Sequence, residues 1–282
     1  MTTRAELVRK IMKCPVCGAD LSVTEDRKSA VCGGARKHCF DFSKDGYLSF
    51  PQNSGGGDSK GAVDARRSFL DKGYYGTQMQ AVADAVSKYL FKDAIIIDAG
   101  CGEGYYTESI AENADGVIGF DLSKFACSAA AKRAKREGRD NLMYSTASVF
   151  ELPVKDRAAD AVVNIFAPCA EDEYRRILRD GGYLFVVGAG RDHLMGLKQA
   201  IYDNVYENGE RADLPENMEH VEKIVSRSDI VLENREDIAA LFSMTPYYWR
   251  TSEQDKEKLN GVRRLETAVE FEINVYRKSK QE

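Results

Sequence analysis

The chain has 282 residues, with 40 Lys and Arg, 45 Asp and Glu, and a formal net charge of -5. Its content of 43% hydrophobic and 30% charged residues is that of a globular protein and excludes a largely disordered chain. No apolar run approaches the roughly 18 residues that cross a bilayer, and the N-terminus lacks the apolar stretch of a secretory signal. We therefore expect a cytoplasmic protein with one large domain, or with a large and a small one. The acidity argues against a plain nucleic-acid binder.

A cysteine cluster marks the N-terminal segment, where four of the seven cysteines lie close together: Cys14, Cys17, Cys32 and Cys39. A CxxC pair followed by further ligand-type residues is typical of a zinc ribbon. From spacing alone, His38 and Cys39 both fit the fourth ligand position. A redox CxxC would open a helix in a βαβ context, which the neighbouring sequence lacks. The pattern predicts a structural zinc ribbon over residues 1–50, because this segment is too short to bury a core of its own.

A connector follows over residues 51–75 and contains the glycine-rich run 53–61. Strands and helices then alternate. The apolar runs predict strands at 94–98, 117–121, 142–148, 161–166, 182–189 and 221–227, and the helices between them at 105–112, 124–137, 171–179 and 193–207. Continuously apolar strands between helices indicate a parallel sheet covered on both faces. The alternating run 267–277 suits a half-exposed edge strand or an antiparallel strand. The fold class is therefore α/β and doubly wound over residues 76–282.

The most informative motif is IIIDAGCGEGYY at 95–106, in which a buried strand ends and a glycine-rich turn leads into a helix. Gly100, Gly102 and Gly104 let a ligand approach the backbone. Asp121 ends the next predicted strand, where a carboxylate accepts hydrogen bonds from both hydroxyls of a ribose. The turn therefore predicts a site for a nucleoside-containing cofactor.

Two cofactors compete for this turn. The dinucleotide fingerprint is GxGxxG, but the position of its third glycine is occupied by Tyr105. Asp98 and Glu103 would repel a pyrophosphate, whereas they suit the cationic sulfonium and the amino group of S-adenosylmethionine. Spacing and charge both favour S-adenosylmethionine, and the pattern resembles motif I of the class I methyltransferases.

The whole chain resembles the bacterial 23S rRNA guanine-N1 methyltransferases, whose substrate is a hairpin loop of the large-subunit RNA. The blocks that carry the resemblance are CPVC (14–17), HCFDFSKDGYLSF (38–50), ARRSFLDKGYY (65–75), DAGCGEGYYT (98–107), AAAKR (129–133), APC (167–169), RDHLMGLKQAIYDNVYEN (191–208) and MTPYYWR (244–250). The resemblance implies a class I methyltransferase with a mostly parallel seven-stranded sheet behind a small zinc-ribbon domain.

The resemblance also implies roles for individual residues. Zinc would be held by Cys14, Cys17, Cys32 and His38, with Cys39 as the rival of His38. The cofactor contacts would fall on Tyr75, Gly102, Glu103 and His193, with the motif residues Asp98, Gly100, Gly104 and Asp121 beside them. By the same resemblance, we expect a homodimer whose paired zinc domains help to form an RNA-binding cleft. One branch of the family is associated with resistance to macrolide-type antibiotics, and the branches differ in which guanine they modify.

Target contacts in such folds are expected at the end of the fourth strand, here FAPC at 166–169. The NPPY-like tetrad of enzymes that methylate exocyclic nitrogens is missing there. We interpret Cys169 as a buried small residue rather than a nucleophile. Glu171, Asp172 and His193 are candidates for a general base, and the sequence does not rank them.

Two further runs have alternative interpretations. The basic run 129–139 could contact phosphates, although a solvated helix face is the commoner explanation. The aromatic residues of 244–250 could stack on bases or pack against the core or a dimer partner.

Two other functions remain open from sequence: a small-molecule methyltransferase with a zinc ribbon for dimerisation, and a non-catalytic zinc module that binds rRNA. The distribution of charge favours an RNA substrate. Residues 1–75 contain 13 Lys and Arg against 9 Asp and Glu, so the acidic surplus lies entirely in the remainder of the chain. This distribution fits an N-terminal module that reads RNA. The basic surplus lies in the ribbon and connector, in Arg27, Lys28, Arg36, Lys37, Lys44, Arg66 and Arg67.

Overall fold

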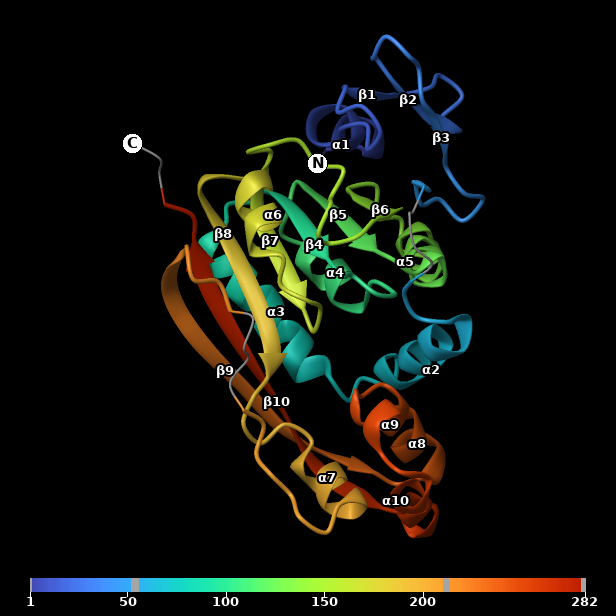
Figure 1. The fold of residues 1–282 in the computed structure, drawn as a ribbon, viewed down its shortest axis with the longest axis vertical. Helices are drawn as coiled ribbons and strands as arrows, with labels where there is room; N and C mark the ends of the chain where they lie inside the picture. Colours follow the sequence, from blue (N-terminus) through green and yellow to red (C-terminus); the bar gives the residue numbers. More distant parts are fainter. Residues whose placement is uncertain (1, 52–55, 210–213, 280–282) are drawn as a thin grey trace.

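The computed structural model describes residues 2–51, 56–209 and 214–279, and its centre is a seven-stranded sheet (Figure 1). The strand order is β6-β5-β4-β7-β8-β10-β9. The strands are β4 (Ile95–Ala99), β5 (Gly116–Asp121), β6 (Leu142–Thr146), β7 (Ala159–Ile165), β8 (Leu178–Ala189), β9 (Glu219–Leu232) and β10 (Leu265–Arg277). The five strands from β6 to β8 run parallel, whereas β10 is antiparallel to both of its neighbours. The predicted parallel α/β sheet is confirmed.

Helices cover both faces of the sheet, because consecutive side chains of each buried strand point to opposite faces. One apolar cluster joins alternate strand residues to α2 (Lys60–Leu70), α3 (Gly76–Tyr89), α4 (Tyr105–Ala111), α5 (Lys124–Arg136), α7 (Met195–Ile201) and α8 (Arg235–Ser243). The other cluster joins the remaining strand residues to α1 (Arg4–Ile11) and α6 (Glu171–Ile177).

The N-terminal segment contributes directly to this second face. Leu7 and Val8 of α1 are fully buried in the same cluster as Ile118 and Phe120 of β5. Leu48 adds a parallel bridge at the edge of β6. Between them lies a small antiparallel sheet made of β1 (Leu21–Val23), β2 (Ser29–Cys32) and β3 (Cys39–Asp41). The first fifty residues therefore combine a small ribbon with elements that complete the core of the large sheet.

The connector contains more regular structure than its composition predicts. Residues 53–55 of the glycine-rich run lie outside the described residues, but α2 begins at Lys60, within that run. The Ser59 side chain caps the helix by accepting the backbone N–H of Ala62. This helix buries Phe69 and Leu70 against the first apolar cluster, so tertiary contacts stabilise it.

The structure decides between the two alternatives for one strand and shortens one predicted helix. Strand β10 is antiparallel as predicted, but it is neither at an edge nor half-exposed, because β9 pairs along its other side and Glu270 and Asn274 are buried. The helix predicted over 193–207 is confined to α7, Met195–Ile201. Its start is set by Leu194, which has a left-handed backbone with φ of 57°.

Three helices near the C-terminus were not predicted from the sequence: α8, α9 (Tyr247–Arg250) and α10 (Glu253–Lys258). They lie with α7 at the lower end of the molecule in Figure 1, beyond the carboxyl ends of the parallel strands. Across the described residues, every helix is too short or too polar to span a bilayer.

Candidate cofactor, metal and substrate sites

The glycine-rich turn connects β4 to α4 at the carboxyl edge of the sheet. Gly100 has a left-handed φ of 87°, and a Cβ at this position would lie 2.5 Å from the Cβ of Ala167 in the loop after β7. Gly102 has a φ of 56°, and the nearest atom to its missing Cβ is Nη1 of Arg66, 4.0 Å away. Gly100 therefore permits close packing of two loops, whereas Gly102 leaves the outer side of the turn accessible to a ligand.

Asp121 ties the end of β5 to this turn. Its carboxylate accepts the backbone N–H groups of Gly102 at 3.0 Å and of Ser123 at 2.7 Å. A carboxylate offers about four lone pairs, so two remain for the hydroxyls of a ribose. Burial raises the pKa of Asp121 above its usual value. The geometry therefore fits the predicted contact with the cofactor's ribose.

Two more carboxyl groups lie buried at the turn. Asp98 accepts the Thr107 hydroxyl at 2.6 Å through Oδ2, but its Oδ1 has no hydrogen-bond partner within the described residues. Burial raises the pKa of Asp98 to about 7 and also raises the pKa of Glu103, whose Oε1 is likewise unpartnered within the described part of the chain. Unsatisfied buried carboxylates favour a cationic ligand and disfavour a phosphate. S-adenosylmethionine fits this set of carboxylate acceptors, and a dinucleotide does not.

Tyr75 and His193 come together from distant parts of the chain. Tyr75 precedes α3 and His193 follows β8, yet their ring centroids lie 6.2 Å apart. Both rings pack edge-on against Phe271 of β10, at 5.7 and 5.6 Å. Both residues are buried. The predicted cofactor residues therefore occupy neighbouring positions along the carboxyl edge of the sheet.

The hydrogen bond of His193 determines its tautomer. Its Nδ1 accepts the backbone N–H of Glu270 at 3.2 Å, so Nδ1 carries no proton. Burial, together with the charge of Lys198, lowers the pKa of His193 to about 3, which keeps the ring neutral. The neutral ring then carries its proton on Nε2. His193 is therefore a hydrogen-bond donor toward an acceptor such as a carboxylate, rather than a general base at Nδ1.

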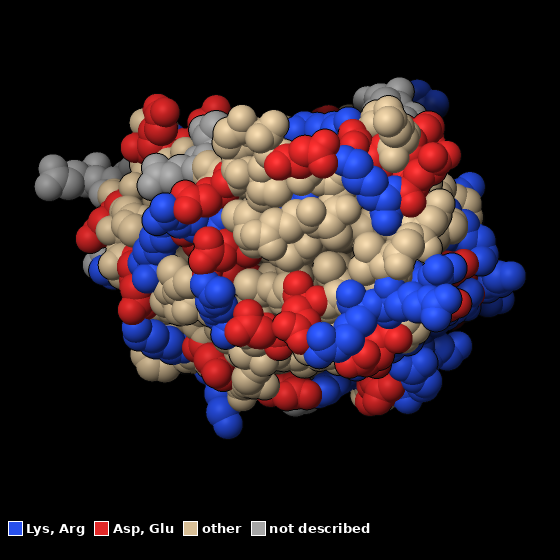
Figure 2. All heavy atoms as spheres, turned by 90° about the horizontal axis from the view of Figure 1, so that it is seen from below, with Lys and Arg blue, Asp and Glu red and all other residues tan. Residues whose placement is uncertain are grey.

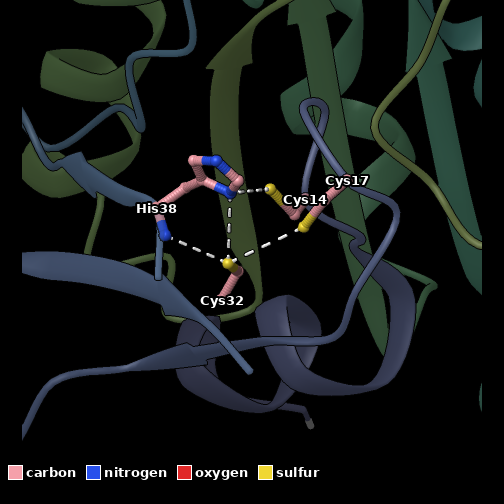
Figure 3. A group of neighbouring side chains, drawn as sticks. All are labelled: Cys14, Cys17, Cys32 and His38. Atoms are coloured by element: carbon pink, nitrogen blue, oxygen red, sulfur yellow. Dashed lines mark hydrogen bonds between the residues drawn. The ribbon is translucent and has the colours of Figure 1, made fainter. Parts of the chain in front are cut away.

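The cysteine cluster forms a compact ligand set (Figure 3). The ligand atoms of Cys14, Cys17, Cys32 and His38 all lie within 4.8 Å of one another. His38 Nδ1 lies 3.5 Å from Cys14 Sγ and 3.4 Å from Cys32 Sγ, while the sulfurs of Cys17 and Cys32 are 3.9 Å apart. Tetrahedral zinc requires separations of about 3.8 Å between sulfurs and about 3.6 Å between sulfur and nitrogen. These four residues could therefore hold zinc.

The surroundings of Cys32 favour a thiolate. The backbone N–H of His38 donates to Cys32 Sγ at 3.1 Å, and this bond is the main reason that the pKa of Cys32 falls to about 6. Cys39, the rival fourth ligand, is exposed on β3 and is not a member of the group.

Comparisons with known proteins agree with this geometry. A family described as "Methyltransferase domain" matches residues 96–182, which contain the glycine-rich turn and Asp121. The 23S rRNA (guanine(748)-N(1))-methyltransferase of Streptomyces fradiae is 32% identical over 202 residues, covering 69% of each chain. A candidate 23S rRNA (guanine-N1)-methyltransferase of Bacillus subtilis, YxjB, is 28% identical over 281 residues, covering 93% of this chain and 95% of YxjB.

This chain belongs to the 23S rRNA (guanine-N1)-methyltransferase family. Its fold matches the solved structure of the YcgJ protein from Bacillus subtilis with a TM-score of 0.52, covering 72% of this chain and 98% of YcgJ. At 13% identity that likeness concerns the fold alone. The methyltransferase is therefore a class I enzyme that depends on S-adenosylmethionine.

The residues proposed as general bases do not converge on one position in the methyltransferase. Both carboxylate oxygens of Glu171 accept backbone N–H groups, from Glu216 at 3.0 Å and from Asn217 at 2.7 Å. Asp172 is fully exposed on α6, and Cys169 is half-buried beside the second apolar cluster. Glu171 thus has a structural role, and the geometry favours no general base.

The resemblance implies that the connector 51–75 caps the cofactor pocket, but sequence reasoning did not identify the strap, which we define as residues 56–59 together with Arg66. The Ser123 hydroxyl donates to the Asp58 carbonyl at 2.6 Å, and a Cβ on Gly57 would lie 2.5 Å from the Ser123 backbone N. Arg66 pairs with the Asp58 side chain at 2.6 Å. Arg66, one of the residues of the predicted basic surplus, therefore lies next to the cofactor turn.

A second missed residue is Asn208, which organises the loop of His193. Its Nδ2 donates to the carbonyls of Gly190, Arg191 and His193, and its Oδ1 accepts from Lys198 and Tyr247. Asn208 lies in the block that carries the family resemblance, but nothing in the sequence indicates these partners.

The two runs with alternative interpretations are partly resolved by their contacts. In the basic run, Lys132 pairs with Asp45, Arg133 with Asp71, and Arg139 with Glu112. These pairs favour a role within the fold. In the aromatic run, Tyr247 and Tyr248 pack against the core, whereas Trp249 is 81% exposed. Among these three aromatic residues, Trp249 alone is fully available to stack on a base.

Proposed function

We propose that this protein transfers a methyl group from S-adenosylmethionine to N1 of a guanine in a hairpin loop of 23S rRNA. The observation that carries the proposal is the relationship to the Streptomyces fradiae enzyme, at 32% identity over 202 residues. A buried acidic turn that fits a cationic cofactor supports it independently. N1 lies on the pairing edge of guanine, so an unpaired loop is the form of RNA that presents it.

S-adenosylmethionine, when bound, supplies an electrophilic methyl group on a positively charged sulfur. Asp121 binds the ribose hydroxyls through its two remaining lone-pair positions. Asp98 and Glu103 provide negative charge in a buried site, where its attraction for a cation is strong. With its proton on Nε2, His193 would donate a hydrogen bond to the carboxylate of the cofactor, and Tyr75 would close the pocket beside it. These residues orient the donor for an in-line attack, which is the main contribution that such a reaction needs.

The ribbon supplies part of the RNA surface in this proposal. Its basic residues Arg27, Lys28, Arg36, Lys37 and Lys44 are exposed. A groove of about 580 Å³ is lined by Arg27, Lys28, Lys44 and Phe42, together with neighbouring acidic and hydroxyl side chains. Cationic and aromatic side chains together suit the phosphates and bases of a loop.

The lower face of the molecule, at the opposite end from the ribbon in Figure 1, offers a second surface for the RNA. In Figure 2, Lys and Arg side chains gather on the right, the side on which α2 and α5 lie in Figure 1, and the centre is largely uncharged. An RNA loop placed here would set its phosphates against the basic side and a base against the centre.

The test is methylation of undermethylated 23S rRNA with labelled S-adenosylmethionine, followed by mass spectrometry of the modified fragment. We expect one N1-methylguanine in a hairpin loop. Label on another nucleotide, or only on small molecules, would contradict the proposal.

We further propose that the protein acts in the cytoplasm as a homodimer that binds RNA, on the basis of its family resemblance and its rRNA substrate. Light scattering of the purified protein should give twice the mass of the 31.4 kDa chain. Resistance to macrolide-type antibiotics is associated with one branch of the family that this chain resembles. Growth of cells with and without the gene in such an antibiotic tests it.

A further inference from the structure

Phe166 has an unusual backbone and an unusual exposure. It directly follows β7, its φ is 52°, and its side chain is 50% exposed. A bulky residue in the left-handed region is strained, and such strain persists only where neighbouring structure holds it. Here the Phe166 N–H donates to the carbonyl of Val187 in β8 at 3.0 Å. The fold thus keeps an aromatic ring at the surface at a conformational cost.

The loop that carries Phe166 is fixed against the cofactor turn. The next residue, Ala167, occupies the space that a Cβ on Gly100 would need. The carbonyl of Pro168 accepts the side-chain amide of Asn164 at 2.9 Å. The position of the ring is therefore set before any substrate arrives.

One side of the Phe166 ring is packed. It lies 4.8 Å from Phe271 in an edge-to-face arrangement and 5.8 Å from His193 at an interplanar angle of 31°. The ring therefore packs beside His193, which is proposed to bind the cofactor, and half of its surface stays exposed. An exposed aromatic face beside a methyl donor suits a flat nucleobase, because every base can stack on it.

The sheet topology places Phe166 on the path of the cofactor. The strand order reverses between β4 and β7, and ligands of doubly wound sheets bind at such a reversal. A cofactor held by Asp121 after β5 and by His193 after β8 passes in front of the end of β7. The methyl group of a cofactor bound in this way would lie within reach of a base resting on Phe166.

We propose that Phe166 is a substrate-binding residue that stacks on the target guanine and holds its N1 at the methyl donor. This inference rests on the proposed function. Guanine N1 gains the methyl carbon, the bond from that carbon to sulfur breaks, and the N1 proton passes to solvent. Phe166 takes no part in the bond changes and acts by positioning the base.

The test compares three substitutions at one position. F166A removes the ring, F166G removes the ring and relieves the left-handed strain, and F166W retains an aromatic face. We expect F166A and F166G to lower kcat/KM for the rRNA fragment about 10- to 100-fold, and F166W to stay within about fivefold of wild type. The dissociation constant for S-adenosylmethionine should stay within about threefold in all three variants. Phe91, which is 81% exposed between α3 and β4, provides the matched control F91A, and its activity should be unchanged.

The outcomes separate this inference from the proposed function. A wild-type protein that modifies no guanine N1 overturns both. With an active wild type, full activity of F166A overturns the stacking role alone. A loss of cofactor affinity in F166A equal to its loss of activity also overturns it, because the ring would then be a cover for the cofactor. Circular dichroism spectra of F166A and F166G that match that of the wild type exclude misfolding as the cause of their lost activity.

Discussion

The ribbon and the large sheet reach ordered structure by different physical means. The sheet buries two extensive apolar clusters, one on each face, and most of the charged residues in its strands lie in the antiparallel strands β9 and β10. The ribbon has three strands of three or four residues each and a ligand set of three cysteines and one histidine. A bound metal can supply the stability that a segment this small lacks, whereas the sheet gains its stability from burial.

The ribbon and the large sheet are not formed by two successive stretches of the chain. Helix α1 precedes the ribbon, yet Leu7 lies against Gly116 at the start of β5. Removal of the first fifty residues would therefore strip one face of the sheet as well as the ribbon. Point substitutions separate the two regions, and a truncation does not.

The largest expected effect is on stability, from Leu7→Ala. Leu7 is fully buried, so the substitution leaves a cavity under the sheet and should lower the free energy of unfolding by about 2–5 kcal/mol. Urea denaturation measures it. Val16→Ala is the control: Val16 is 59% exposed in the ribbon, and its loss should change stability by less than about 0.5 kcal/mol. Equal effects of the two variants would show that α1 does not belong to the core of the sheet.

The second prediction concerns the ribbon and its zinc ligands. Cys17 is exposed, so Cys17→Ser disturbs little apart from the ligand set. We expect loss of bound zinc and a fall in rRNA methylation on the order of 100-fold, because the ribbon loses its main source of folding energy. Affinity for S-adenosylmethionine should stay within about threefold, as measured by calorimetry.

Cys39→Ser is the matched control for this second prediction, because Cys39 is exposed and lies outside the ligand group. It should retain both zinc and activity. Zinc loss in Cys39→Ser with zinc retention in a His38 variant would show that Cys39, and not His38, is the fourth ligand.

The same two regions show what local sequence reveals. The glycine-rich turn, Asp121 and the cysteine pairs could be predicted, because spacing along a short stretch determines their chemistry. The role of α1 could not, because Leu7 and Gly116 meet only after folding. The alternation in β10 correctly indicated an antiparallel strand, but the burial of Glu270 depends on pairing with β9.

In the cofactor site, too, some features follow from local sequence and others only from the folded structure. Its residues were named from motifs and from the family resemblance, and these assignments remain predictions. The tautomer of His193 depends on the backbone of Glu270, which is 77 residues away in the chain. The strap and Asn208 are similarly non-local. Short motifs therefore indicated which cofactor binds, whereas the side-chain partners around it required the structure.

The third prediction concerns the buried charge at the cofactor turn. The pKa of Asp98 is raised to about 7 from a usual value near 3.8, so the folded protein holds a proton that the unfolded chain has lost. The contribution of Asp98 to stability therefore falls as pH rises from about 4 to about 7, and it is constant above that. A cationic ligand favours the ionised form, so affinity for S-adenosylmethionine should rise by up to about tenfold between pH 6 and pH 8.

Calorimetry at the two pH values, on the wild type and on Asp98→Asn, isolates this contribution. The amide cannot titrate, so the variant should lack the part of the pH dependence that Asp98 causes. Identical pH profiles for the two proteins would mean that the charge of Asp98 does not act on the cofactor.

The smallest expected effect tests the strap, which links the two regions across the cofactor turn. Asp58→Asn removes the charge that pairs with Arg66 but leaves the Asp58 carbonyl bound to Ser123. Because partly exposed ion pairs contribute little, we expect S-adenosylmethionine to dissociate only about two- to fivefold faster. Stopped-flow release measures this rate. Asp64→Asn is the control. It breaks the ion pair between Asp64 and Lys60 on α2, the helix that also carries Arg66, without involving the strap. A faster release in both variants would assign the effect to the stability of α2, whereas a faster release in Asp58→Asn alone would show that the connector retains the cofactor.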